Sequence, residues 1–169
     1  MFKKILIILV IGLFILTGCA TMDTADYVAD APEKVKTADW SKMETVTVKL
    51  SEHKFTPSTL AFKTGTPYKL QIKNIGSIKH YFVSEDFFKA IATRKIQSSD
   101  GEIKAPYFTA IEVFPDRTID LYFIPVKKGR YSLICTIQGH AESGMIGNIV
   151  IEHSGMKKGK SSSGYGSGY

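Results

Sequence analysis

Cysteine is scarce in this chain of 169 residues, which contains only Cys19 and Cys135. Cys19 closes an apolar N-terminal segment, and processing of that segment is expected to consume its sulfur. Cys135 then has no partner for an intrachain disulfide. An unpaired thiol outside the cytoplasm is exposed to oxidation and to wrong pairing. Cys135 is therefore expected either to be deeply buried or to have a chemical role.

Long hydrophobic runs are also lacking, apart from one at the N-terminus. Residues 5–16 form an apolar run of twelve residues that follows Lys3 and Lys4. The run is shorter than the about 20 residues of a membrane-spanning helix, but it matches the hydrophobic region of a signal peptide. The sequence Leu16-Thr-Gly-Cys19 that follows resembles the lipobox of bacterial lipoproteins. The resemblance implies cleavage before Cys19 and lipid attachment to its sulfur.

The alternative at the N-terminus is an uncleaved membrane anchor. In both cases we expect the rest of the chain to be tethered to a bacterial membrane, with the domain facing the periplasm or the cell exterior. Several acyl chains hold a protein firmly, since each buried CH₂ contributes about 0.8 kcal/mol.

A concentrated basic surface is the third feature that the sequence lacks. The formal net charge is +6, and loss of Lys3 and Lys4 by cleavage lowers it to +4. Three of the remaining positive charges lie in the C-terminal tail, at Lys157, Lys158 and Lys160. The folded body is therefore almost neutral, and no basic stripe with interleaved aromatic residues occurs. These features argue against nucleic-acid binding.

Alternation of apolar and polar residues dominates the chain from Thr45 onward and predicts about eight short strands. The predicted strands lie in residues 45–51, 54–62, 67–74, 78–84, 109–113, 118–125, 130–135 and 145–152. Turn residues separate them, as at Gly65-Thr-Pro67 and Pro115-Asp116. The pattern favours an all-β sandwich.

One segment departs from this alternation. Residues 85–97 begin with acidic residues, end with basic ones and place apolar residues at helical offsets, which predicts one short helix followed by a loop to Pro106. The whole chain is then divided into a signal peptide (1–18), a lipidated N-terminus and linker (19–44), a β-domain (45–153) and a Gly/Ser/Tyr tail (154–169). We expect the tail to be disordered, because it has too few apolar side chains to bury.

Cys135 opens a segment in which a thiol, an imidazole and a thioether recur at regular spacing. The segment reads Cys135-Thr-Ile-Gln-Gly-His140-Ala-Glu-Ser-Gly-Met145. Cys135 is predicted to end one strand and Met145 to begin the next, so that one connection supplies three ligands. His80, in the predicted strand 78–84, supplies a fourth. One thiolate, two imidazoles and a weak axial thioether suit a copper ion that carries one electron.

These residues resemble those of the cupredoxins, the small blue copper proteins. The Cys-x4-His-x4-Met spacing is most similar to that of rusticyanin and auracyanin. The resemblance covers about residues 45–152. The matching segments are Phe55-Thr-Pro57, Gly65, Asn74-Ile-Gly76, His80, Tyr131-Ser-Leu-Ile-Cys135-Thr-Ile-Gln-Gly-His140 and Gly144-Met145-Ile-Gly147.

The resemblance implies an eight-stranded Greek-key sandwich and single-electron transfer. It also implies a type 1 copper ion with His80, Cys135 and His140 as equatorial ligands and Met145 as the axial ligand. One position differs. Many cupredoxins carry Asn directly after the first ligand histidine, where this chain has Tyr81. This difference affects the residues that support the ligands, and therefore the reduction potential.

We therefore expect a membrane-tethered monomer that carries single electrons between redox partners, such as cytochromes or membrane oxidoreductases. His140 is expected to expose one ring edge within an apolar docking patch. The patch residues are Ile137, Gly139, Ala141 and Ile146.

Three other functions were weighed. Copper storage or delivery is the main alternative, although the five methionines are scattered rather than clustered. An enzyme is disfavoured, because a Cys/His hydrolase needs an orienting third residue and a binuclear copper centre needs a second cysteine. Zinc is disfavoured by the methionine, since zinc prefers Cys, His or carboxylate ligands. His53 and His153 belong to no motif and are expected to be solvated.

Overall fold

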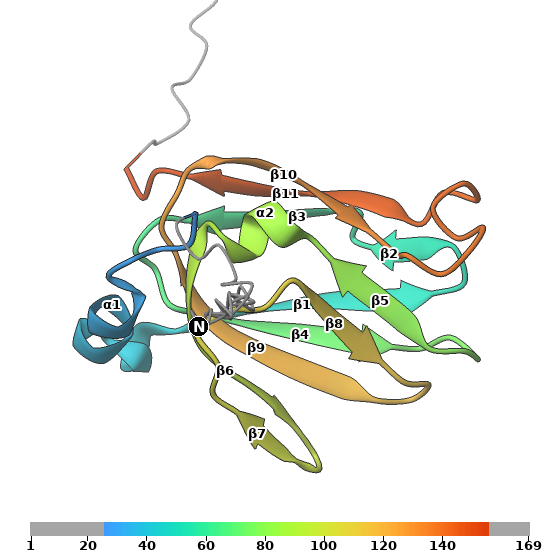
Figure 1. The fold of residues 1–169 in the computed structure, drawn as a ribbon, viewed down its shortest axis with the longest axis horizontal. Coiled ribbons are helices and arrows are strands. Elements are labelled where there is room, and N and C mark those ends of the chain that lie inside the picture. The colour runs from blue at the N-terminus through green and yellow to red at the C-terminus, as the bar shows by residue number, and fades with distance from the viewer. Residues whose placement is uncertain (1–25, 156–169) are drawn as a thin grey trace, which may run out of the picture.

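Two β-sheets packed face to face form the body of the protein in a computed structural model that describes residues 26–155 (Figure 1). The six-stranded sheet has the order β2 (Lys54–Thr56), β1 (Glu44–Ser51), β4 (Tyr68–Asn74), β9 (Thr118–Pro125), β6 (Ile91–Ser98) and β7 (Gly101–Ile103). The five-stranded sheet has the order β3 (Thr59–Lys63), β11 (Ile146–Glu152), β10 (Gly129–Ile134), β5 (His80–Val83) and β8 (Ala110–Val113). The prediction of an all-β sandwich is confirmed, with eleven strands in the described residues.

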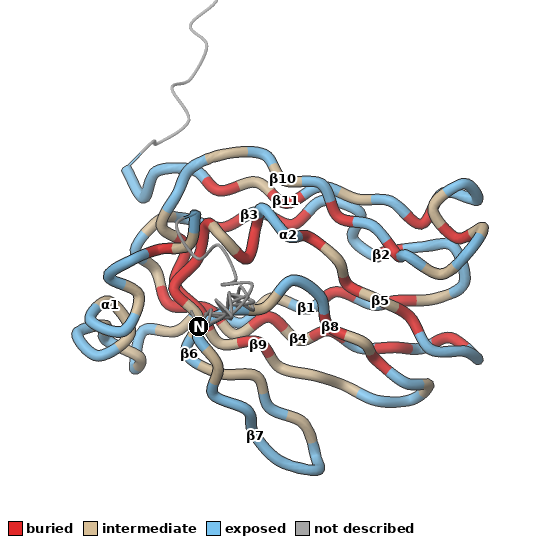
Figure 2. Tube along the Cα trace, viewed as in Figure 1, coloured by how far each residue is buried: buried red, intermediate tan, exposed pale blue. Residues whose placement is uncertain are grey.

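The core lies between the two sheets and is built from the apolar side of each alternating strand (Figure 2). In β4 the buried residues are Tyr68, Leu70, Ile72 and Asn74, while the intervening side chains are half-buried or exposed. This is the period of two that the sequence predicts, because successive side chains of a strand point to opposite faces. Phenylalanine rings from both sheets fill the centre, and Phe62 contacts Phe123 edge to face at 5.1 Å between ring centroids.

Strand register brings three of the predicted ligands to one end of the five-stranded sheet. Strand β10 is antiparallel to both β11 and β5. Ile134 at the end of β10 pairs with Ile146 at the start of β11 and with Val83 of β5, so β5 runs back from this pair to His80. Cys135 follows the last residue of β10, Met145 precedes the first residue of β11, and His80 is the first residue of β5. We call this end of the sandwich the ligand end.

The helix predicted for residues 85–97 is mostly wrong. Helix α2 spans only Glu85–Phe88, and Ile91–Ser98 form β6, which pairs with β9. The predicted loop that follows contains β7, which forms a hairpin with β6. Pairing with β9 buries Ile91 and Ala92 and so outweighs the local helical preference.

The predicted linker also differs from the observed structure. It contains helix α1 (Ala31–Thr37) and the 3₁₀ helix η1 (Trp40–Lys42), which pack against the body. The Arg94 guanidinium lies over the Trp40 ring at 4.4 Å from its centroid, and Tyr27 Oη donates to the Phe108 carbonyl at 3.2 Å. Lys127 Nζ donates to the Asp26 carbonyl. Residues 26–43 are therefore part of the folded domain.

The signal peptide, Cys19 and most of the predicted tail lie outside the described residues. Between residues 26 and 155, no helix has the length and apolar character needed to cross a membrane.

Candidate metal centre

His80, Cys135 and His140 form one compact cluster at the ligand end. Their ligand atoms all lie within 4.8 Å of one another, and all three residues are buried. Cys135 Sγ is 4.0 Å from His80 Nδ1 and 3.6 Å from His140 Nδ1. Among residues 26–155 no other group of three His, Cys, Asp or Glu side chains meets the same criterion.

These separations fit a single transition-metal ion. Ligand distances of about 2.0 Å to nitrogen and 2.3 Å to sulfur, spread at about 120° around an ion, place nitrogen and sulfur about 3.7 Å apart. The observed values of 3.6 and 4.0 Å agree with that spacing. One thiolate and two imidazoles, with a thioether nearby in sequence, match the ligand set of a type 1 copper site. The expectation of copper as the cofactor is therefore supported by the donor set.

Main-chain hydrogen bonds hold the Cys135 sulfur and its neighbours. The Tyr81 N–H donates to Cys135 Sγ at 3.5 Å. The Tyr81 side chain points away from this contact, because its hydroxyl donates to Glu112 Oε1 at 2.9 Å. Lys79 pairs with the same carboxylate at 2.7 Å, and hydrogen bonds from Lys79 and Tyr81 lower the pKa of Glu112. The residue that stands in place of the usual Asn thus supports the thiolate through its backbone alone.

Backbone hydrogen bonds within the segment from Cys135 to Met145 hold its two ends together. Met145 N donates to the His140 carbonyl at 2.8 Å, and Cys135 N donates to the Met145 carbonyl at 3.2 Å. Gly139 and Gly144 have φ values of 80° and 103°, which side-chain-bearing residues rarely adopt. Met145 is fully buried. Its predicted role as the axial ligand stays a prediction that rests on this burial and on the loop that fixes its backbone.

The Asn74 side chain fixes the backbone of the segment that precedes His80. Its Nδ2 donates to the Ile78 carbonyl at 2.7 Å and to the Val113 carbonyl at 2.9 Å. Its Oδ1 accepts from the Gly76 N–H at 2.8 Å. Asn74 is fully buried, so this network sets the path of the backbone before His80. The Asn-x-Gly sequence was part of the resemblance, but its structural role was not predicted.

The space around His80 is tight on the side away from Cys135. A Cβ atom added at Gly76 would lie 2.9 Å from His80 Nε2 and 2.6 Å from Glu52 Oε1. Burial lowers the pKa of His80, His140 lowers it further, and Glu52 opposes both effects. A depressed pKa keeps the imidazole neutral, which is the form that binds a metal.

Sequence analysis missed the turn between β1 and β2, which contributes Glu52 and His53 to this region. Glu52 Oε1 accepts from Ser77 N at 2.6 Å and from Ser77 Oγ at 2.9 Å. The His53 ring meets the His140 ring edge to face, with centroids 5.0 Å apart and planes at 90°. His53 is exposed as expected, but it also contacts a predicted ligand; His153 is simply exposed. No local sequence signal marks this turn.

Several large apolar side chains are exposed near the cluster, but they differ from the predicted patch. His140 is only 6% exposed, and Ile137, Gly139 and Ala141 are half-buried. Ile146 is 56% exposed, as the predicted patch requires. Other large apolar side chains near this end are also exposed, namely Ile75, Ile78 and Phe114 at 50%, 43% and 58%. They come from the segment before His80 and from the turn after β8, which pairs with β5.

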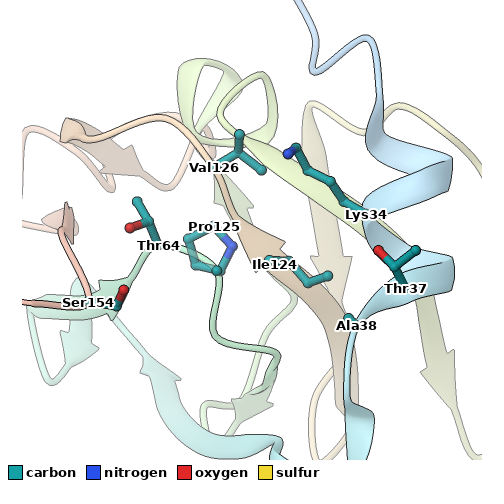
Figure 3. A pocket seen from close by; sticks show the side chains of 9 residues that line it. Lys34, Thr37, Ala38, Thr64, Ile124, Pro125, Val126 and Ser154 are labelled. Carbon is teal, nitrogen blue, oxygen red and sulfur yellow. The ribbon is translucent and has the colours of Figure 1, made fainter.

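An open pocket of about 450 Å³ lies at the opposite end of the sandwich (Figure 3). It is lined by residues of α1, such as Lys34 and Thr37, and by Pro125 and Val126 at the end of β9. Figure 3 shows the Lys34 and Thr37 side chains on α1, across from Val126 and Pro125. None of the predicted ligands lines this pocket, so it is separate from the metal centre.

Comparisons with known proteins agree with the fold. A family model described as a cupredoxin-like domain matches residues 6–150. The copper-resistant cuproprotein CopI of Rubrivivax gelatinosus is 29% identical over 110 residues, which are 63% of this chain and 66% of that protein. The matched part thus spans slightly less than two thirds of that relative.

A solved multicopper oxidase shows the same fold at low sequence identity. A multicopper oxidase from Pseudomonas thermotolerans is similar with a TM-score of 0.54 and 20% identity, over 68% of this chain and 31% of the oxidase. The dithionite-reduced auracyanin of Roseiflexus castenholzii aligns with a TM-score of 0.46 and 16% identity, over 64% of this chain and 96% of auracyanin. This chain therefore spans about a third of the length of that oxidase.

Proposed function

This chain belongs to the cupredoxin-like family, and from that premise we propose that it carries single electrons between redox partners outside the cytoplasm. The cluster of His80, Cys135 and His140 is the observation that carries the proposal. A copper ion bound there would supply a one-electron couple, because thiolate and imidazole ligands suit both Cu(I) and Cu(II).

Electron transfer requires that the ligands of the metal stay fixed. Little has to move on electron arrival when the donor atoms are already fixed. Cys135 accepts from the Tyr81 N–H, His80 begins a strand that pairs with β8, and the Met145 N–H donates to the His140 carbonyl. The Cys135 sulfur and the backbone of the other ligand residues are thus held by hydrogen bonds that do not depend on the metal.

We further propose that the chain acts as a carrier and not as an enzyme. A nucleophilic cysteine must reach its substrate, whereas Cys135 is fully buried. Catalytic metal sites keep a coordination position open to substrate. At this centre the ligand atoms are covered, and the fully buried Met145 occupies the same end of the sandwich.

A second candidate is copper storage or delivery. The similarity to a protein named as a copper-resistant cuproprotein favours it. Burial of all three clustered ligands argues against it, because a delivery protein has to release its ion to the next binder. Slow exchange of copper with an external chelator supports the electron carrier, and fast exchange supports delivery.

The lipobox adds a tether to this proposal. If Cys19 carries the lipid, only residues 20–25 separate it from Asp26, the first residue that the structure describes. That length spans at most about 25 Å. Asp26 is bonded to Lys127, which follows β9 at the end of the sandwich opposite the ligand end. Figure 1 shows α1 at one end of the molecule and the β10–β11 connection at the other.

The tether would therefore hold the ligand end away from the membrane. Such an orientation favours a redox partner that is soluble or that projects from the membrane, such as a cytochrome domain. The exposed Ile75, Ile78 and Ile146 would form part of the docking surface.

Stopped-flow mixing tests the proposed function. Copper-loaded protein is mixed with a reduced c-type cytochrome, and cytochrome oxidation is followed. Oxidation within seconds, with copper retained by the protein afterwards, supports electron transfer. Absence of oxidation combined with loss of copper to a chelator would replace this proposal with copper delivery.

A further inference from the structure

We infer that the Glu52 carboxylate is the hydrogen-bond acceptor for Nε2 of the His80 ligand, on the side of the ring away from the metal. We infer further that this carboxylate lowers the reduction potential of the bound copper. The inference deepens the proposed function and rests on copper binding at His80. Glu52 lies in the two-residue turn between β1 and β2, which belong to the sheet opposite that of His80.

The geometry places the carboxylate beside the far nitrogen of the His80 ring. Glu52 Oε1 and His80 Nε2 lie 2.6 and 2.9 Å from one point, the position of a Cβ atom added at Gly76. Only a glycine at this position lets the two groups approach each other. Two hydrogen bonds from Ser77 fix the carboxylate there. Hydrogen bonds from its own backbone N–H and from Ser77 lower the pKa of Glu52 to about 2, so the group is ionised at neutral pH.

The His80 ring carries a hydrogen on Nε2, the ring nitrogen near Glu52. Its Nδ1 faces Cys135 Sγ and is the metal-binding atom, so Nε2 carries the hydrogen in the ligating form. Nε2 is buried and has no hydrogen-bond partner among the residues that the structure describes. A buried donor without an acceptor is costly, and ligand histidines usually donate this hydrogen to a carboxylate or carbonyl. Glu52 is the nearby carboxylate, and in our proposal it accepts this hydrogen in the copper-bound protein.

The other polar groups near His80 Nε2 already take part in other hydrogen bonds. Asn74 Oδ1 accepts from the Gly76 N–H, and the Ser77 hydroxyl donates to Glu52 itself. The other titratable neighbours of His80 are His140 and His53, and Glu52 is the acidic group among them. His53, the next residue of the turn, contacts the His140 ring. The turn thus contacts the His140 ring through His53 and places the Glu52 carboxylate near the His80 ring.

The sign of the effect follows from charge. Cu(II) carries one more positive charge than Cu(I), so a nearby carboxylate stabilises the oxidised site more than the reduced one. A carboxylate that accepts the Nε2 hydrogen also makes the imidazole a stronger donor to the metal. Both effects lower the reduction potential. Glu52 is a positioning residue, since it acts through His80.

Spectroelectrochemistry of the full chain in detergent tests the charge. In Glu52→Gln the amide oxygen can still accept from Ser77, but the charge is lost. We expect the preference for Cu(I) over Cu(II) to rise about three- to tenfold, where tenfold is about 59 mV for one electron. Glu33→Gln on α1 removes the same charge at the opposite end and is expected to leave the potential unchanged. Equal potentials for wild type and Glu52→Gln would overturn the inference.

Nitrogen NMR of the copper-free protein tests the contact without the metal. The wild-type His80 ring is expected to hold its hydrogen on Nε2, and Glu52→Ala is expected to shift the population toward the Nδ1–H tautomer. An unchanged tautomer in Glu52→Ala would also overturn the inference. If the wild type shows no reversible copper couple, the proposed function fails, while the tautomer still decides the role of Glu52.

Discussion

The backbone N–H of Tyr81 donates a hydrogen bond to Cys135 Sγ at 3.5 Å, so the residue after one predicted ligand supports the sulfur of another. This contact joins Tyr81 of β5 to Cys135, the residue that follows β10. Within the two strands, Ile134 and Val83 are the only paired residues. Because the donor is a backbone group, the contact survives a change of side chain. It explains how Tyr81 can stand at a position where many cupredoxins have Asn.

Gly76→Ala is expected to weaken copper binding by tenfold or more. The added Cβ would lie 2.6 Å from Glu52 Oε1 and 2.9 Å from His80 Nε2, so either the carboxylate or the ligand ring must move. Competition for copper with a chelator of known affinity measures the change. Gly155→Ala is the matched control, since no atom lies within 4 Å of its added Cβ. Equal affinity in both variants would contradict the tight packing around His80.

Asn74→Ala is expected to lower the free energy of unfolding by about 2–4 kcal/mol. The substitution leaves the carbonyls of Ile78 and Val113 and the N–H of Gly76 without their partner. Urea denaturation of the copper-free protein measures the loss. Asn148→Ala changes an exposed asparagine and should cost less than 1 kcal/mol. A similar small loss in both variants would mean that the Asn74 network contributes little to stability.

Met145→Leu is expected to raise the reduction potential while the fold is retained. Leucine fills a buried methionine site at a cost usually below 1.5 kcal/mol, but it has no sulfur to donate to copper. Loss of a weak axial donor destabilises Cu(II) more than Cu(I). Potentiometry measures the shift, with Met43→Leu as a control away from the ligand end. A potential that does not move would show that Met145 is not a ligand.

Removal of residues 26–43 is expected to destabilise the domain by about 3 kcal/mol relative to a chain that begins at Asp26. The shorter chain loses burial of Val28, the Tyr27 hydrogen bond and the contact between Trp40 and Arg94. These contributions are about 1.5 kcal/mol for a buried valine and about 0.5–1 kcal/mol for each of the others. Thermal unfolding compares the two chains. Equal melting temperatures would mean that residues 26–43 act only as a linker.

Much of the fold could be predicted, because side chains of a two-faced sheet alternate along each strand. The residues of β4 and β10 follow that alternation closely. The prediction that Cys135 ends one strand and Met145 precedes the next is also confirmed, by β10 and β11. The helix prediction for residues 85–97 was mostly wrong for a physical reason. Their apolar spacing suits a helix as well as a strand, and pairing with β9 decides between them.

The support around the ligands could not be predicted from local pattern. Glu52 lies near His80 and His53 contacts His140 only because the β1–β2 hairpin lies at the ligand end. The Asn74 network joins two carbonyls, one of them 39 positions away in the sequence. Contacts of this kind depend on how the two sheets are assembled, and no periodicity in the sequence encodes them.

The visible spectrum of the protein with Cu(II) tests the central claim most directly. One equivalent of Cu(II) is added to the copper-free full chain in detergent, and to Cys135→Ser under the same conditions. We predict an intense thiolate-to-copper absorption band in the wild type and none in Cys135→Ser. A colourless wild type, or a band that persists without the Cys135 sulfur, would contradict the assignment of a type 1 copper site.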